Sequence, residues 1–211
     1  DGQNWKSVVT QTDFAKPETV PTFTFEKTQA RYVRLNITGM RKSGGEYRAQ
    51  IGEFEIYNDD GSVPAPKNEP DEDNKPDKPS ANLALNATVI CSSSYEEPPY
   101  WTKAGINDGL LHDAITDDGM HCGWSSAVNA NPKQDGATEW IGYDFGKKTT
   151  VNTVIVYTAR HPVADAFPID FCVEVSDDGK NWRIPKSDEI TTALLGNLEE
   201  ALTTILTQPE S

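Results

Sequence analysis

Residues 171–182 read FCVEVSDDGKNW, a run that alternates apolar and polar residues and ends in an Asp-Gly turn. Alternation with a period of two residues is typical of a half-buried β-strand. Asp-Gly after such a run is a strong hairpin signal, because a tight hairpin turn requires a positive φ angle. We therefore expect a strand at 171–176, and we place Trp182 on the strand that returns.

The same alternation recurs along most of the chain. In 51–57, IGEFEIY, Glu53 and Glu55 share the face opposite Phe54 and Ile56. Short strands separated by turns, without helices between them, predict an all-β antiparallel jelly-roll sandwich. The other strand candidates are 22–26, 31–37, 85–91, 139–145 and 151–158. Apolar residues at helical spacing predict one short helix, near 188–206.

One segment has a very different composition. Residues 59–80 hold five prolines, seven acidic residues and three lysines, and no aromatic residue. Such a segment cannot bury apolar surface, and its prolines favour extended polyproline II. We expect a linker at 59–81 between two parts of a β domain, 1–58 and 82–184, and a helical tail at 185–211.

A short repeat divides the domain. Residues 1–5 read DGQNW and residues 178–182 read DGKNW. The first copy lacks the strand that would open its hairpin, and the second runs into Pro185 and the helical pattern. The two parts are therefore complementary halves that break at the same hairpin.

A linker of 22 residues reaches about 70 Å in polyproline II. We expect the halves to assemble as one permuted jelly roll, within one chain or between two. Residues 32–37 would then pair with strands beyond the linker, and Glu53 would approach Asp108. The alternative is that the chain contains parts of two truncated tandem domains.

Several motifs carry a family resemblance. Residues 82–182 resemble the front of a discoidin domain, also called the coagulation factor 5/8 type C domain, whose bacterial relatives include the family 32 carbohydrate-binding modules. Residues 1–57 resemble its back half. The resemblance implies an eight-stranded, galactose-binding-like jelly roll with ligand loops at one end. The motifs are NLA (82–84), INDG (106–109), GWSS (123–126), EWI (139–141), DFG (144–146), VEVSDDG (173–179), DGQNW (1–5), ARYVRL (30–35) and IGEFEIY (51–57).

The sequence Asn107-Asp108-Gly109 offers carboxylate and carbonyl oxygens at a tight turn, which suits the oxygen coordination of Ca²⁺. The resemblance implies a structural calcium held by Asp108, by a hydroxyl of Ser125 or Ser126, and by Glu53. The alternative is an ordinary Asn-Asp-Gly turn.

Two loops carry residues suited to a sugar, which needs an aromatic ring for its apolar face and polar groups for its hydroxyls. The stretch EEPPYWT at 96–102 displays Tyr100 and Trp101, and Arg160 and His161 directly follow a predicted strand. The resemblance implies that an Arg after this strand meets the sugar. The alternative is that Trp101 packs into the end of the jelly roll and Arg160 pairs with a surface acid.

Charge excludes some partners. The chain has 19 Lys and Arg against 33 Asp and Glu, a net charge of −14, which argues against nucleic acid and an anionic membrane surface. The basic residues that do gather are expected on a solvated strand face: Arg31, Arg34, Arg41, Lys42 and Arg48. Cys91, Cys122 and Cys172 are expected to be buried thiols, or one disulfide and one free thiol.

The sequence has no nucleophile elbow, phosphate loop or zinc motif. We therefore expect a non-catalytic carbohydrate-binding module, with a galactose-type glycan as ligand. The resemblance implies a secreted or surface-attached multidomain glycan-active protein of a bacterium. The alternatives are a discoidin-type adhesion module that binds protein or phospholipid, and a fragment of a glycoside hydrolase.

Overall fold

A computed structural model describes residues 10–12, 14, 20–43, 45–58, 81–109, 122–127, 138–157, 159 and 166–185. Only residue 81 of the linker expected at 59–81 is described, and the helix expected near 188–206 lies outside the described residues. The described strands are β1 (Thr10–Gln11), β2 (Thr22–Gly39), β3 (Lys42–Ser43), β4 (Glu46–Tyr47), β5 (Gln50–Ile51), β6 (Glu53–Tyr57), β7 (Thr88–Cys91), β8 (Trp124–Ser125), β9 (Glu139–Tyr157) and β10 (Asp170–Ser176). Two short 3-10 helices, η1 (Leu83–Asn86) and η2 (Lys103–Ile106), complete the described elements.

The strands form a six-stranded sheet in the order β1-β10-β2-β9-β6, with β7 also paired to β9, and the two small pairs β3-β4 and β5-β8. Every one of these pairings is antiparallel. The predicted all-β antiparallel fold is therefore confirmed. The segment 85–91 is a strand only from Thr88, because η1 occupies Leu83–Asn86 before it.

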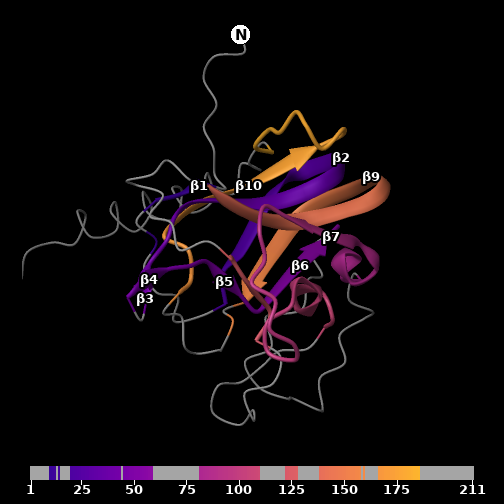
Figure 1. The fold of residues 1–211 in the computed structure, drawn as a ribbon. Coiled ribbons are helices and arrows are strands. Elements are labelled where there is room, and N and C mark those ends of the chain that lie inside the picture. Colours follow the sequence, from indigo (N-terminus) through magenta and orange to yellow (C-terminus); the bar gives the residue numbers. More distant parts are fainter. Residues whose placement is uncertain are drawn as a thin grey trace, which may run out of the picture.

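Two strands are longer than the alternation predicted. β2 joins the predicted runs 22–26 and 31–37, and β9 joins 139–145 and 151–158. The register of the pairing between β2 and β9 changes between Thr24 and Thr28 and again between Ala30 and Tyr32. Such changes are expected where paired strands bend. β9 turns back on itself where it passes the exposed residues 146–148, with Gly146 at φ +71° (Figure 1).

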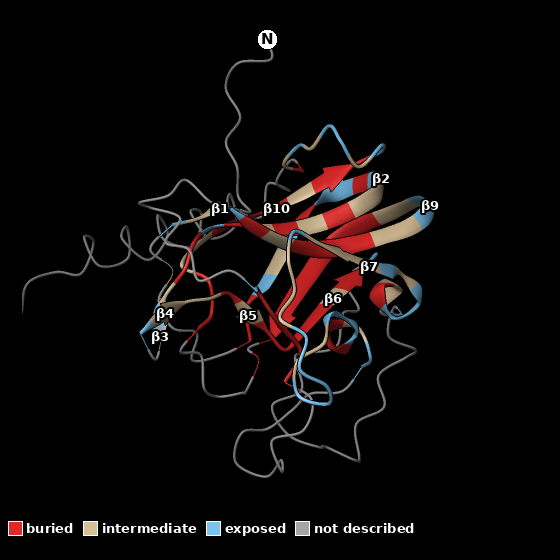
Figure 2. Ribbon diagram, in the orientation of Figure 1, coloured by how far each residue is buried: buried red, intermediate tan, exposed pale blue. Residues whose placement is uncertain are grey.

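The bend gives β9 two different neighbours on one edge. Its first part pairs with β7 at residues 141–144, and its last part pairs with β6 at residues 153–157. Across the core, the ring of Phe54 on β6 stacks on Tyr143 of β9, with centroids 5.4 Å apart. Fully buried side chains of β2 and β9 line the core (Figure 2). They are Val33, Leu35 and Ile37 on β2, and Ile141, Val154 and Val156 on β9.

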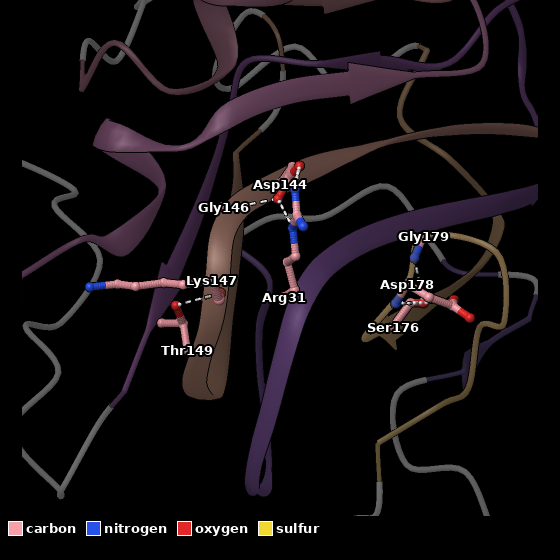
Figure 3. Close-up of polar contacts among 8 residues, drawn as sticks. All are labelled: Arg31, Asp144, Gly146, Lys147, Thr149, Ser176, Asp178 and Gly179. Carbon is pink, nitrogen blue, oxygen red and sulfur yellow. Dashed lines mark hydrogen bonds and ion pairs between the residues drawn. The ribbon is translucent and has the colours of Figure 1, made fainter.

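Strands from before and after residues 59–81 alternate in the sheet. β2 lies between β10 and β9, and β9 lies between β2 and β6. Tyr32 pairs with Ser176 on one side and with Asp144 on the other, so the pairing expected for 32–37 is present. Side chains also join β2 to β9: Arg31 makes a bidentate contact with Asp144, at 2.8 Å for each bond (Figure 3).

The predicted Asp-Gly turn follows β10. Gly179 has φ +71°, and Arg183 pairs with Val175 on the returning segment. Asp178 Oδ1 accepts hydrogen bonds from the backbone N–H groups of Asn181 and Lys180, both at 2.8 Å. Ser176 Oγ also accepts from Gly179 N at 3.0 Å (Figure 3). The turn therefore carries Trp182 back toward Tyr32, at 6.3 Å between ring centroids.

We expect Asp178→Ala to lower Tm by a few degrees at pH 7 and by less at pH 2.5. The hydrogen bonds from Asn181 and Lys180 lower the pKa of Asp178 below its ordinary value. The contribution is therefore fully present above the unfolded pKa of about 3.9, declines below it, and is lost only as the pH falls through the lowered folded-state pKa. Thermal melts of the variant and the parent at both pH values measure this, and equal Tm values at pH 7 would contradict it.

Candidate functional site

The loop that follows β7 is fixed at its base. Ser93 Oγ donates to the buried carboxylate of Glu139 at 2.7 Å, and the indole N–H of Trp124 donates to the carbonyl of Ser93 at 2.9 Å. Residues 96–100 beyond this base are all exposed (Figure 2). The loop thus presents its tip to solvent from an anchored base.

Tyr100 and Trp101 lie at the tip in different environments. Tyr100 is 43% exposed. Trp101 is half-buried, and its backbone bridges both Glu97 and Gly123. Tyr100 is therefore free to meet a ligand ring, whereas the segment of Trp101 is held by the neighbouring loop. The other two predicted sugar residues, Arg160 and His161, lie outside the described residues.

A second group of polar residues lies beside this loop, and the sequence did not suggest it. The guanidinium of Arg48 lies over the ring of Tyr95, with Cζ 4.8 Å from the ring centroid. Arg48 Nη2 also lies 2.7 Å from Glu46 Oε2. Tyr95 donates its hydroxyl to Glu97 Oε2 at 2.9 Å, which raises the pKa of Tyr95. We call Glu46, Arg48, Tyr95 and Glu97 the loop cluster.

The prediction that the basic residues share one solvated strand face is wrong. Arg31 and Arg34 lie on β2, where they pair with Asp144 and Glu174. Arg41 instead donates to the carbonyl of Phe14, and Arg48 belongs to the loop cluster. Pairing with residues distant in sequence separates basic residues that lie close together along the chain.

Glu53 is a fully buried carboxylate at the start of β6. Its Oε1 accepts a hydrogen bond from the backbone N–H of Gly109 at 3.2 Å, and its buried Oε2 has no hydrogen-bond partner. Burial, and next the charge of Asp108, raises the pKa of Glu53 to about 9. The expected approach of Glu53 to Asp108 is thus present.

The side chains of Tyr143 and Asn107 hold in place the two segments that carry the carboxylates. The hydroxyl of Tyr143 lies 2.6 Å from the carbonyl of Phe54 and 2.9 Å from that of Ile106. Asn107 Nδ2 donates to the carbonyls of Ala84 and Ala87 at 2.7 and 3.1 Å. Because Phe54 follows Glu53 and Asn107 precedes Asp108, these bonds fix the place where the two acids meet.

This place fits a hard cation. A buried carboxylate with one unpartnered oxygen beside a second carboxylate is costly unless a proton or a cation compensates the charge. Within the described residues, no three His, Cys, Asp or Glu side chains form a metal-binding group. A Ca²⁺ ion held by Glu53 and Asp108 would therefore need carbonyl oxygens as well, which Ca²⁺ accepts readily.

The two predicted hydroxyl ligands form contacts with β5 and the residue before it. Ser126 Oγ accepts from the backbone N–H of Ala49 at 3.1 Å, and Ser125 Oγ lies 3.5 Å from Gln50 Nε2. Both serines are fully buried. Their role as metal ligands remains a prediction.

None of the three cysteines, all of which lie in the described residues, forms a disulfide. Cys122 and Cys172 are buried and Cys91 is half-buried. This agrees with the expectation of thiols that behave as small apolar residues and not with the alternative of one disulfide.

Within the described part of the chain, no helix is long and apolar enough to cross a membrane.

The described strands form an antiparallel β fold with a buried core, and aromatic and charged side chains lie on its loops. A family model for the F5/8 type C domain matches residues 88–208, more than half of the chain. The chain therefore belongs to the F5/8 type C, or discoidin, family, whose domains are binding modules and generally non-catalytic. No curated protein matches the chain.

Proposed function

We propose that the chain is a non-catalytic carbohydrate-binding module of a larger glycan-active protein. The observation that carries the proposal is the exposed ring of Tyr100, presented on an anchored loop beside the charged groups of the loop cluster. An exposed aromatic ring supplies the flat apolar contact that a sugar face needs, and charged groups nearby supply partners for its hydroxyls.

The proposed ligand is a galactose-type glycan at the surface of a cell or in a secreted matrix. The parent protein would be secreted or surface-attached, and bacterial. A module of this kind holds a linked partner domain near its substrate and raises the effective concentration of that domain.

We further propose that Ca²⁺ stabilises the module at Glu53 and Asp108. The ion would neutralise the buried carboxylate and tie β6 to the segment after η2. Its proposed role is structural, because the fully buried Glu53 cannot meet a glycan.

The expected result on a glycan array is binding without hydrolysis. Tyr100→Ala is expected to weaken binding roughly thirtyfold, because loss of a desolvated aromatic anchor costs about 2 kcal/mol. Arg160→Ala is expected to act in the same direction. Leu85→Ala is the matched control, since Leu85 is the other large exposed apolar side chain among the described residues, at 47%.

Other results would favour the alternatives. Binding to phospholipid vesicles or to a protein ligand, with no glycan bound, would indicate an adhesion module. Release of free sugar from the array glycans would indicate a hydrolase fragment. Normal binding by both Tyr100→Ala and Arg160→Ala would place the sugar on another face.

A further inference from the structure

The loop cluster is held from both sides before any ligand arrives. The backbone N–H of Tyr95 donates to the carbonyl of Ser125 at 2.8 Å. On the other side, Ser126 N donates to the carbonyl of Ala49, next to Arg48, at 2.9 Å. Residues 125 and 126 thus fix the backbones that carry Tyr95 and Arg48. A preorganised pair loses less conformational entropy when it binds.

The cluster is also continuous with Tyr100. The backbone carbonyl of Glu97 accepts from Tyr100 N at 2.9 Å and from Trp101 N at 3.1 Å. The side chain of the same Glu97 accepts a hydrogen bond from the hydroxyl of Tyr95. Glu97 therefore links the backbone of Tyr100 to the side chain of Tyr95, over whose ring Arg48 lies.

The charges in the cluster restrict what can bind. The guanidinium that lies over the Tyr95 ring is itself planar and carries several N–H donors in one plane, the arrangement that binds paired oxygen atoms. One Nη of Arg48 contacts Glu46, the Nε is buried without a partner, and the side chain remains 26% exposed. The carboxylates of Glu46 and Glu97 accept hydrogen bonds from hydroxyl groups but repel an anionic ligand.

We propose that the loop cluster is a sugar subsite beside Tyr100 that selects neutral sugars with adjacent hydroxyl groups and rejects acidic sugars. This inference rests on the carbohydrate-binding function proposed above. Arg48 donates hydrogen bonds to the paired sugar oxygens, and Glu97 accepts a hydrogen bond from a sugar hydroxyl. Two carboxylates against one guanidinium, in a chain of net charge −14, disfavour a uronate or a sialic acid.

The test measures the full chain with methyl galactoside and with methyl galacturonide, which differ by one carboxylate. Calorimetry or saturation-transfer NMR gives both affinities. The parent chain is expected to prefer the galactoside at least tenfold. Arg48→Ala is expected to weaken galactoside binding about tenfold, and Arg48→Lys is not expected to restore it, because an ammonium lacks the planar donor pair.

Glu97→Gln is the second variant, and it should narrow the preference between the two sugars by severalfold. Lys42→Ala is the matched control, because Lys42 lies over the ring of Tyr47 at 5.8 Å in a separate cation–aromatic pair. Its affinity and preference should equal those of the parent chain.

The outcomes separate the two proposals. If the parent chain binds the galactoside but Arg48→Ala and Glu97→Gln bind as it does, the subsite is wrong and the carbohydrate function stands. Equal or tighter binding of the galacturonide also overturns the subsite. If the parent chain binds no glycan at all, the carbohydrate function fails and the subsite fails with it.

Discussion

Chelation of Ca²⁺ is expected to lower Tm on the order of 10 °C, and Glu53→Gln is expected to abolish that response. A ligand at about 1,000 times its Kd stabilises the folded state by about 4 kcal/mol. For a chain of this size, about 1 kcal/mol shifts Tm by about 2–4 °C. The amide of Gln keeps the shape of Glu53 but has no charge to attract the ion.

The pH dependence of the chelated protein gives an independent measurement. The folded-state pKa of Glu53, about 9, lies above its ordinary value. Between the two values the folded state binds a proton that the unfolded state has lost, so stability falls as the pH rises from 5 to 9. Glu53→Gln should remove this slope, and the variant should be more stable than the chelated parent at pH 8.

Glu55→Gln is the matched control, since Glu55 lies two residues along the same face of β6. Its Oε2 accepts the hydroxyls of Tyr57 and Tyr157 at 3.0 and 3.2 Å, so it has partners that Glu53 Oε2 lacks. The control should keep the calcium response. A parent chain with no bound metal and an unchanged Tm under excess chelator would contradict the calcium proposal.

The fold was predictable because its signals are local. Alternation in β2 gave the burial of Val33, Leu35 and Ile37 correctly, since each side chain in a strand faces opposite to its neighbour. The turn after β10 followed from Asp178 and Gly179. The merging of two predicted strands into β9 was not predictable, because a bend in a paired strand depends on what packs against both halves.

Some residues of the candidate site could be predicted from the sequence, and one of its contacts could not. Asp108 and Tyr100 lie in turns that composition marks, and Glu53 was paired with Asp108 through the family resemblance. The stacking of Arg48 on Tyr95 left no trace in the sequence, because it joins residues far apart in the chain by an approach of side chains. The pairing of Gln50 with Ser125, together with the hydrogen bond from Tyr95 N to the carbonyl of Ser125, brings those segments together.

A cut within residues 59–81 is expected to leave the module assembled. β2 and β6 precede this segment, and β9 and β10 follow it, yet β2 lies between β10 and β9. Backbone pairing between β2 and β9 extends from Thr22 to Ile37. Separation of the two pieces would therefore break four of the described strand pairings of this sheet at once, β1–β10, β10–β2, β2–β9 and β9–β6, and expose the core to water.

The experiment inserts a protease recognition sequence between Asn68 and Glu69 and cuts the folded protein. Light scattering after gel filtration should show one particle of about the parent mass, 23.2 kDa. Denaturant should then separate the pieces. After the cut, Tm should depend on protein concentration, because the association has become bimolecular.

The uncut insertion variant is the control for the insertion itself. Its mass also distinguishes assembly within a chain from exchange between chains, since exchange gives twice the parent mass before any cut. Two separate peaks in native buffer would mean that residues 20–58 do not complete the sheet of residues 82–184. The account of two truncated tandem domains would then stand, and the strand order β10-β2-β9-β6 would be wrong.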